Sequence, residues 1–282
     1  GRARVRRGDW QLAVEPLERA AAVWRGTAPS PDGAAVALAL VQAYVQAGRL
    51  ADAMPVAFEA MRQVRAGMPL PDWAQGSSAL IDASRCLPAA VAPMALSGAD
   101  AANAAMALRA FDAQGDAALA HAAEKLAALL ERTDEGASDR ASDREPAVPT
   151  SPAPRATESD RQGFALLDGL RDAMSDDAAT RAKARRSLAT LKRSLPPWSD
   201  AWIRYATGDS LTREPETQAK ERGVVLLLSV DVSDRLAQPM LAAAARARAA
   251  AALASLGNAS GAERIRNSGP SSPIHSPETT RP

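Results

Sequence analysis

The fold of this chain is indicated most clearly by residues 41–60, which read Val41-Gln-Ala-Tyr-Val-Gln-Ala-Gly-Arg-Leu-Ala-Asp-Ala-Met-Pro-Val-Ala-Phe-Glu-Ala60. Within this stretch, Gly48, Ala53 and Ala60 follow Tyr44 at offsets of four, nine and sixteen residues. An aromatic residue placed four before a glycine is typical of the last turn of a helix, and the glycine suits the left-handed corner that follows. Alanines seven apart then let a second helix pack closely against the first. The stretch therefore predicts a pair of antiparallel helices joined by a tight corner.

The same spacing recurs elsewhere in the chain. One complete copy consists of Phe111, Gly115, Ala120 and Ala127. A copy without the aromatic residue consists of Arg4, Gly8, Ala13 and Ala20. Weaker copies consist of Trp73, Leu80, Ser84, Ala89 and Leu96, and of Leu253, Gly257 and Ala262. The recurrence predicts a protein made of repeated helix pairs.

This pattern resembles the tetratricopeptide repeat, a two-helix unit of about 34 residues that stacks into a solenoid. The resemblance covers residues 1–130 well and 240–265 in part, and the spacing fades between 157 and 239. It implies an all-α, tetratricopeptide-like α-solenoid of antiparallel helix pairs. It also implies a noncatalytic scaffold for protein–protein interaction, which binds a peptide or protein partner in the concave groove of the solenoid.

Six polar residues are expected to face this groove from the first helices of the pairs. They are Gln42, Gln46, Ser78, Asp82, Arg109 and Asp112. Family members that clamp the C-terminal carboxylate of heat-shock chaperones present lysine, arginine and asparagine there, and Arg109 alone resembles that set. The resemblance therefore implies recognition of a peptide or helix through many small polar and apolar contacts.

Two stretches rich in proline and serine divide the chain. Residues 133–160 contain a tandem Ala-Ser-Asp-Arg and almost nothing apolar, which predicts a disordered linker. Residues 267–282 predict a disordered tail for the same reason. Residues 1–132 are expected to form the tetratricopeptide-like repeats and 161–266 a further helical, repeat-like segment. The two segments either dock into one solenoid or move independently.

The second segment shows helical spacing of its own. Apolar residues three and four apart predict two amphipathic helices, one through Phe164, Leu167, Leu170 and Met174, and one through Ala184, Leu188, Leu191 and Leu195. Trp198, Trp202 and Tyr205 predict an aromatic core cluster on a helix that ends at a corner formed by Gly208. The apolar run 223–230 is predicted to be a buried helix, because no second strand is available to pair with it.

Composition narrows the classes of partner. Hydrophobic residues make up 46% of the chain and aromatic residues 4%, which indicates a core of alanine, leucine and valine. Lys and Arg number 34 and Asp and Glu 33, so the net charge of +1 provides no overall field toward nucleic acid or an anionic membrane. No stretch approaches the ~18 apolar residues of a membrane span. Gly1 is not a start methionine and falls inside an expected helix, so we expect a fragment or a trimmed chain, and the compartment stays open.

The residues that usually carry chemistry do not form a recognisable site. Cys86 is the only cysteine, and the two histidines, His121 and His275, lie far apart, so no zinc set is expected. Phosphate-binding, metalloprotease and nucleophile-elbow motifs do not occur. The sequence therefore predicts no catalytic residue, cofactor or small-molecule substrate.

Two other functions stay open. In the first, the chain is the regulatory or substrate-presenting arm of a larger multidomain enzyme whose catalytic domain lies outside it. In the second, the basic helix predicted at 181–193 contacts nucleic acid. A solvated helix face is favoured for 181–193, because aspartates lie just upstream and no aromatic residues interleave with the cations.

Overall fold

The computed structural model describes residues 1–7, 9–25, 30–47, 49–65, 98–135, 158–195, 199–234 and 239–268. These residues form twelve α-helices and no strand, which confirms the all-α expectation. In chain order the helices are α1 (Arg2–Arg7), α2 (Trp10–Arg25), α3 (Pro31–Gln46), α4 (Leu50–Arg65), α7 (Gly98–Arg109), α8 (Ala117–Glu135), α9 (Glu158–Ala173), α10 (Ala178–Leu191), α11 (Ser199–Thr212), α12 (Thr217–Asp234), α13 (Pro239–Ser255) and α14 (Ala259–Asn267).

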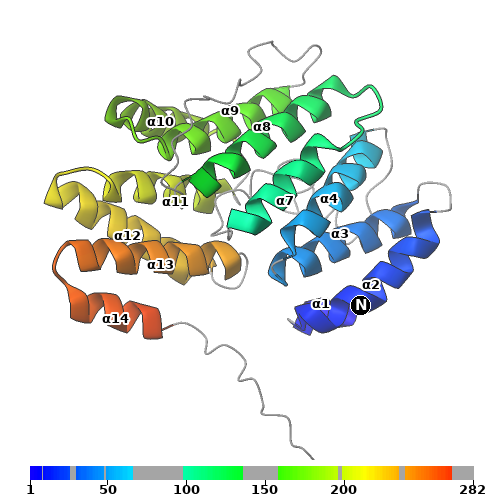
Figure 1. Cartoon of the computed structure of the whole chain (residues 1–282), viewed down its shortest axis with the longest axis horizontal. Coiled ribbons are helices and arrows are strands. Elements are labelled where there is room, and N and C mark those ends of the chain that lie inside the picture. Colours follow the sequence, from blue (N-terminus) through cyan, green and yellow to red (C-terminus); the bar gives the residue numbers. More distant parts are fainter. Residues whose placement is uncertain are drawn as a thin grey trace, which may run out of the picture.

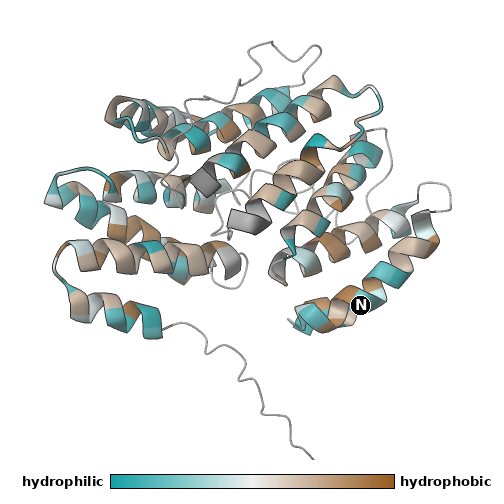
Figure 2. Ribbon diagram, in the orientation of Figure 1, coloured by the Kyte–Doolittle hydropathy of each residue, from teal (hydrophilic) through white to brown (hydrophobic). Residues whose placement is uncertain are grey.

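The helices form a curved array in which each packs on its neighbours along the chain (Figure 1). The array begins with α1 and α2 at the lower right, passes through α8 and α9 at the top, and ends with α13 and α14 at the lower left. α4 packs on α7, and α9 packs on α8, α10 and α11, so the two predicted helical segments dock together. Figure 2 shows apolar and polar residues mixed along the helices, as amphipathic packing requires.

Three corners between helices share one backbone hydrogen bond. In each, an N–H five residues beyond the first landmark of the repeat donates to the carbonyl of that landmark. The pairs are Asp9 to Arg4 (3.0 Å), Arg49 to Tyr44 (2.8 Å) and Asn258 to Leu253 (2.9 Å). This bond is typical of a Schellman ending with a left-handed residue, which Gly257 supplies with a φ of 80°. The repeated spacing thus has a local structural basis at these corners.

Each of these three corners is followed by a fully buried alanine on the second helix. Ala13, Ala53 and Ala262 are all 0% exposed. The later landmark Ala60 is also buried, whereas Ala20 is half-buried. Small side chains at these positions let the paired helices approach closely, as the spacing predicts.

The copy that begins at Phe111 departs from the pattern. α7 ends at Arg109, so Phe111 lies in the following loop, where its ring meets that of Phe58 edge to face with centroids 5.3 Å apart. Gly115 does form a left-handed corner, with φ of 86°. Ala120 is exposed, so its expected packing role is wrong. The later landmark Ala127 is fully buried, as expected, and shares the buried face of α8 with Leu119, Leu126 and Leu130.

The expectation that Gly208 forms a corner is also wrong. Gly208 lies inside α11, where the backbone of α11 closely approaches that of α12 at Gly223. A Cβ on Gly223 would lie 2.7 Å from the carbonyl oxygen of Gly208, and a Cβ on Gly208 would lie 3.0 Å from that of Gly223. Trp202 and Tyr205 are buried in α11, which confirms their core role. The run 223–230 is helical, as predicted, but only one side of it is buried, because Val225 is 67% exposed.

The helices predicted in the second segment form as α9 and α10. Leu167 and Leu170 are buried on α9, and Ala184 and Leu188 are buried on α10. α10 begins at a cap in which the Asp177 carboxylate accepts a hydrogen bond from the backbone N–H of Thr180 at 2.7 Å.

The chain segments predicted to be disordered lie mostly outside the described residues. α8 continues through Glu135 and α9 begins at Glu158, so three residues at each end of the predicted linker 133–160 are helical. Residues 136–157, the predicted tail from 269 onward and the weak repeat copy from Trp73 to Leu96 are not described.

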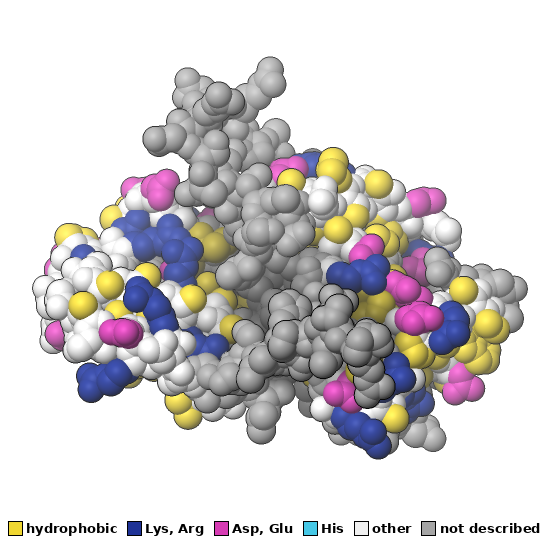
Figure 3. All heavy atoms as spheres, turned by 60° about the horizontal axis from the view of Figure 1, so that its bottom comes forward, with side chains coloured by type: hydrophobic (Ala, Val, Ile, Leu, Met, Phe, Trp, Pro, Cys, Tyr) yellow, Lys and Arg dark blue, Asp and Glu magenta, His cyan; other side chains and the backbone are white. Residues whose placement is uncertain are grey.

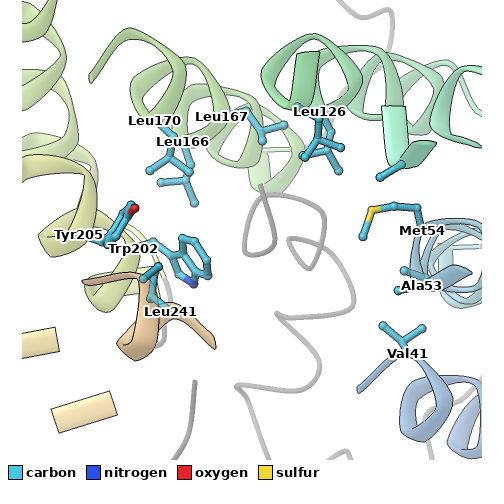
Figure 4. Close-up of a cluster of buried hydrophobic side chains, with 14 of the residues drawn as sticks. Val41, Ala53, Met54, Leu126, Leu166, Leu167, Leu170, Trp202, Tyr205 and Leu241 are labelled. Carbon is cyan, nitrogen blue, oxygen red and sulfur yellow. The ribbon is translucent and has the colours of Figure 1, made fainter. Parts of the chain in front are cut away.

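One apolar cluster runs from Val5 on α1 to Ala252 on α13. Figure 4 shows the side chains that several helices contribute toward the middle of the array, among them Val41, Met54, Leu126, Leu166, Trp202 and Leu241. Trp202, the largest of them, is fully buried. The described helices of both predicted segments therefore share a single core.

Candidate binding surface

The structure describes the side chains of only two of the six residues expected to face a groove. Those outside the described residues are the side chains of Gln42 and Gln46, which belong to α3, and the whole of Ser78 and Asp82. Arg109 is exposed in the last turn of α7. Asp112 is exposed in the loop after α7 and not on the helix, and its Oδ1 accepts the backbone N–H of Gln114 at 2.8 Å. Groove lining stays a prediction for the set.

Arg109 is shared by two carboxylates of α8. Its Nε and Nη2 donate to the two carboxylate oxygens of Glu131 at 3.0 and 2.8 Å, and its Nη1 donates to Glu124 at 2.5 Å. The hydrogen bonds to Glu131 are the main cause that raises the pKa of Arg109 above its usual range. Because one cation faces two anions, this group carries a surplus negative charge.

A similar group ties the first landmark of the best repeat to α2. Arg49 lies between Glu18 at 3.2 Å and Asp52 at 2.7 Å. The Tyr44 hydroxyl donates to Glu18 at 2.8 Å, and the Arg49 guanidinium lies 4.7 Å from the centre of the Tyr44 ring. Burial, followed by the bond to Glu18, raises the pKa of Tyr44 to about 12. The aromatic landmark thus serves as a polar tie between helices as well as a packing residue.

The basic helix predicted at 181–193 uses part of its charge internally. Arg181 is 5% exposed, and its Nη2 lies 3.4 Å from Glu214, while Nη1 of Arg185 lies 2.6 Å from the same carboxylate. Arg181 also donates to the backbone carbonyls of Ser175 and Asp176 at 3.1 and 2.7 Å. A solvated role is therefore wrong for Arg181 and Arg185, because the carboxylate just after α11 draws both side chains inward.

Burial and hydrogen bonding act in opposite directions on Glu214. Burial favours the neutral acid and would raise its pKa. The hydrogen bonds from Arg185 and Arg181 outweigh this effect, so the pKa of Glu214 lies below its usual value. Glu214 is consequently an ionised carboxylate held between two cations at neutral pH.

A second carboxylate of this half is also shared by two cations. Asp209 on α11 is 3% exposed and lies 3.0 Å from Nη2 of Arg213 and 3.4 Å from Nε of Arg248. Its charge is the main cause that raises the pKa of Arg248. Burial, with a smaller contribution from Asp209, raises the pKa of the neighbouring Tyr205 to about 12. A third carboxylate, Asp200, lies between Lys192 and Arg204.

The shared ion groups differ along the array. From α2 to α9, three arginines each lie between two carboxylates, namely Arg49, Arg109 and Arg171. Asp168 of α9 is shared in turn by Lys125 and Arg171. From α10 to α13, three carboxylates each lie between two cations, namely Asp200, Asp209 and Glu214. The cations therefore outnumber their partners in the C-terminal half.

The sequence carries the same division. Residues 98–177 contain 16 Asp and Glu against 8 Lys and Arg, a formal charge of −8, whereas residues 178–268 contain 8 against 15, a formal charge of +7. In the view of Figure 3, Lys and Arg side chains gather on the left half of the molecule, whereas basic and acidic side chains lie close together on the right half. The overall charge of +1 hides this division, and a running sum of charge along the sequence is the signal that finds it.

Three cations of the basic segment point outward. Lys183, Arg186 and Arg193 are exposed, and within the described residues none of them forms an ion pair. Lys183 and Arg186 lie on the side of α10 away from Arg181 and Arg185, and Arg193 lies in the turn just beyond the C-terminal end of the helix. We call these three residues the basic face of α10.

The remaining polar groups have local packing roles. The ring of His121 meets that of Phe164 edge to face at 4.8 Å, and burial, followed by the charge of Lys125, lowers its pKa. Trp202 Nε1 is buried without a hydrogen-bond partner among the described residues. The described ranges contain no group of three His, Cys, Asp or Glu residues placed to hold a metal. In the same ranges, no helix combines the length and apolar character needed to cross a bilayer.

Comparison with known proteins finds no family model, no curated protein and no solved structure that matches this chain. Its described surface combines exposed charged side chains on rigid helices with regions of opposite formal charge.

Proposed function

We propose that this protein is a noncatalytic scaffold for protein–protein interaction, built as a tetratricopeptide-like solenoid that binds a peptide or protein partner in its concave groove. The observation that carries the proposal is the repeated corner, in which the same backbone hydrogen bond and the same buried alanine recur at Tyr44, Arg4 and Leu253. Repeated helix pairs that pack on their neighbours present an extended surface, which is how solenoid proteins bind partners.

The proposed groove is lined by the first helix of each pair. On α3, this proposal assigns partner contact to Gln42 and Gln46, which lie two residues before and two residues after the landmark Tyr44. Amide side chains there would hydrogen-bond the backbone of an extended peptide or the polar side of a helix. Arg109 is already engaged by Glu131 and Glu124. In the same proposal, Arg109 therefore does not bind a free carboxylate of the partner.

The proposal is tested by comparing partner capture by the wild-type chain with capture by a Gln42→Ala/Gln46→Ala variant. Tagged proteins are isolated from the cells that produce this chain, and bound proteins are quantified by mass spectrometry. We expect at least one bound protein to be lost with the variant while its helical circular dichroism is unchanged. A control variant, Ala22→Ser on the exposed side of α2, should retain that protein. Identical bound proteins for all three chains would contradict the proposed groove.

A further inference from the structure

The basic face of α10 has no compensating charge on its own helix. Residues 178–199 contain six Lys and Arg and no Asp or Glu. Two of the six, Arg181 and Arg185, are engaged with Glu214 on the inner side. Lys183 and Arg186 are three residues apart on one side of α10, and Arg193 lies in the turn just beyond the end of this helix. This face is therefore a compact positive surface directed at solvent.

Acidic side chains lie along α8 beside the last turn of α7 and in the loop between these two helices. Glu124 and Glu131 share a single cation, Arg109, and the side chains of all three are 37–40% exposed. Asp112 is exposed in the loop that joins the same two helices. We call Asp112, Glu124 and Glu131 the acidic corner. Two of its carboxylates face Arg109, and Arg62 of α4 also lies nearby, where its Nη1 donates to Oε1 of Gln114 at 2.7 Å.

These two surfaces are kept apart within one molecule. α9 packs between α8 and α10, and Figure 1 shows α10 on one side of α9 with α7 and α8 on the other. No ion pair joins the basic face to the acidic corner among the described residues. Each surface is thus available to a partner of opposite charge, and the chain itself carries a complement for both.

We propose that copies of this chain associate head to tail, with the basic face of α10 of one copy against the acidic corner of α7 and α8 of the next. Such a contact joins two different surfaces, so it does not saturate in a two-fold dimer and instead produces short open chains of copies. This inference is independent of the proposed groove on α3.

The proposed contact depends strongly on salt. Both surfaces are solvent-exposed, and interactions between exposed charges are weak individually and are screened over about 8 Å at physiological ionic strength but over about 30 Å at 0.01 M. Association should therefore be clear at low salt and lost at high salt. An apolar contact would not be lost at high salt, because screening does not weaken it.

The experiment uses two variants of the full chain that are matched in size of charge change. Lys183→Gln/Arg186→Gln/Arg193→Gln removes three positive charges from exposed positions. Asp112→Asn/Glu124→Gln/Glu131→Gln removes three negative charges but keeps the side-chain oxygens that accept from Gln114 and Arg109. A control, Arg222→Gln/Arg264→Gln/Arg266→Gln, removes three positive charges from other exposed positions of the basic half. Circular dichroism establishes that all variants fold.

The measurement is the mass in solution by sedimentation velocity at about 0.02 M and about 0.5 M salt, between which the screening length falls severalfold. We expect the wild-type chain and the control to exceed 29.4 kDa at low salt and to return to 29.4 kDa at high salt. Each of the two surface variants alone should stay at 29.4 kDa. Their equimolar mixture should form a one-to-one dimer and nothing larger, because each variant retains one working surface.

Four outcomes would overturn the inference. A wild-type chain that stays monomeric at low salt would remove self-association altogether. A mixture of the two variants that fails to dimerise, after the wild type has associated, would exclude the head-to-tail pairing. Loss of association in the control would show that general charge, and not α10, is responsible. If a short DNA duplex binds the basic face of a monomeric wild-type chain, the face belongs to a nucleic-acid ligand and the inference is equally wrong.

Discussion

Replacing Glu214 by alanine removes the carboxylate that pairs with both Arg181 and Arg185. Arg181 is almost completely buried, so the change leaves its charge in the protein interior with two backbone carbonyls as partners. Arg185 is more accessible and can turn toward water. The cost of the substitution therefore comes mainly from the stranded charge of Arg181.

The size of this effect follows from the burial of the two arginines. Breaking a buried ion pair by removing one partner costs about 3–5 kcal/mol. The partial exposure of Arg185 and the carbonyls beside Arg181 place this case at the lower end, about 3 kcal/mol. At about 2–4 °C per kcal/mol for a chain of this size, the melting temperature should fall by about 6–12 °C.

The assay is urea unfolding followed by circular dichroism, together with calorimetry. Glu216→Ala is the matched control, because it removes an exposed carboxylate two residues away and should change the free energy of unfolding by less than about 0.5 kcal/mol. Adding Arg181→Met to Glu214→Ala should recover stability, because the stranded charge is then replaced by an apolar side chain. Equal losses for Glu214→Ala and the control, or no recovery with Arg181→Met, would refute this reasoning.

Three further predictions concern backbone packing and pH. Gly223→Ala places a methyl group against backbone atoms of α11 and should lower the free energy of unfolding by about 2 kcal/mol. Gly169→Ala places a methyl group against a leucine side chain only and should lower it by less, as measured by urea unfolding. Equal losses would contradict the close approach of α11 and α12. Tyr44 and Tyr205, the only tyrosines, have pKa values of about 12, so tyrosinate absorbance should not rise near pH 10 in the folded protein, and the stability they contribute should be lost as pH rises from 10 through about 12. Because the pKa of Glu214 lies below 4.5, its contribution should be complete above that pH and lost as acid lowers the pH through the folded value, and acid titration of Glu214→Ala should lack this component.

The sequence predicts the helix corners well because the deciding interactions are local. The bond between Arg49 and Tyr44 spans five residues, as does the one between Asn258 and Leu253. Such a bond needs a helical residue at one end and a left-handed residue shortly after, and both requirements are visible as offsets in the sequence. The burial of Ala53 then follows from its place on the second helix.

The departures arise where distant residues decide the structure. Phe111 lies beyond the end of α7 and packs on Phe58, which is 53 positions earlier in the sequence. The repeat spacing does not relate these two positions. The interpretation of Gly208 as a corner is wrong because Gly208 lies in the middle of α11, where its backbone closely approaches Gly223 of α12. Local spacing contains neither fact, so no offset pattern could have predicted them.

The charged surface shows the same limit. The basic segment 181–193 is evident in the sequence, but its division into inner and outer cations depends on Glu214, which follows it by more than 20 residues. The net charge of +1 also averages away the acidic and basic halves. The sign of the net charge of each half could be predicted from the sequence. Which charged side chains stay exposed could not.

Site-specific photo-crosslinking in the cells that produce the chain is the sharpest test of whether this helical array binds a protein partner in a concave groove. A photoreactive amino acid is placed at Gln42 or Gln46 on α3, and at Ala22 on the exposed side of α2 as the comparison. We expect the two α3 positions to crosslink to the same protein and the α2 position not to crosslink to it. Crosslinks from α2 alone, or to unrelated proteins from the two α3 positions, would contradict this expectation.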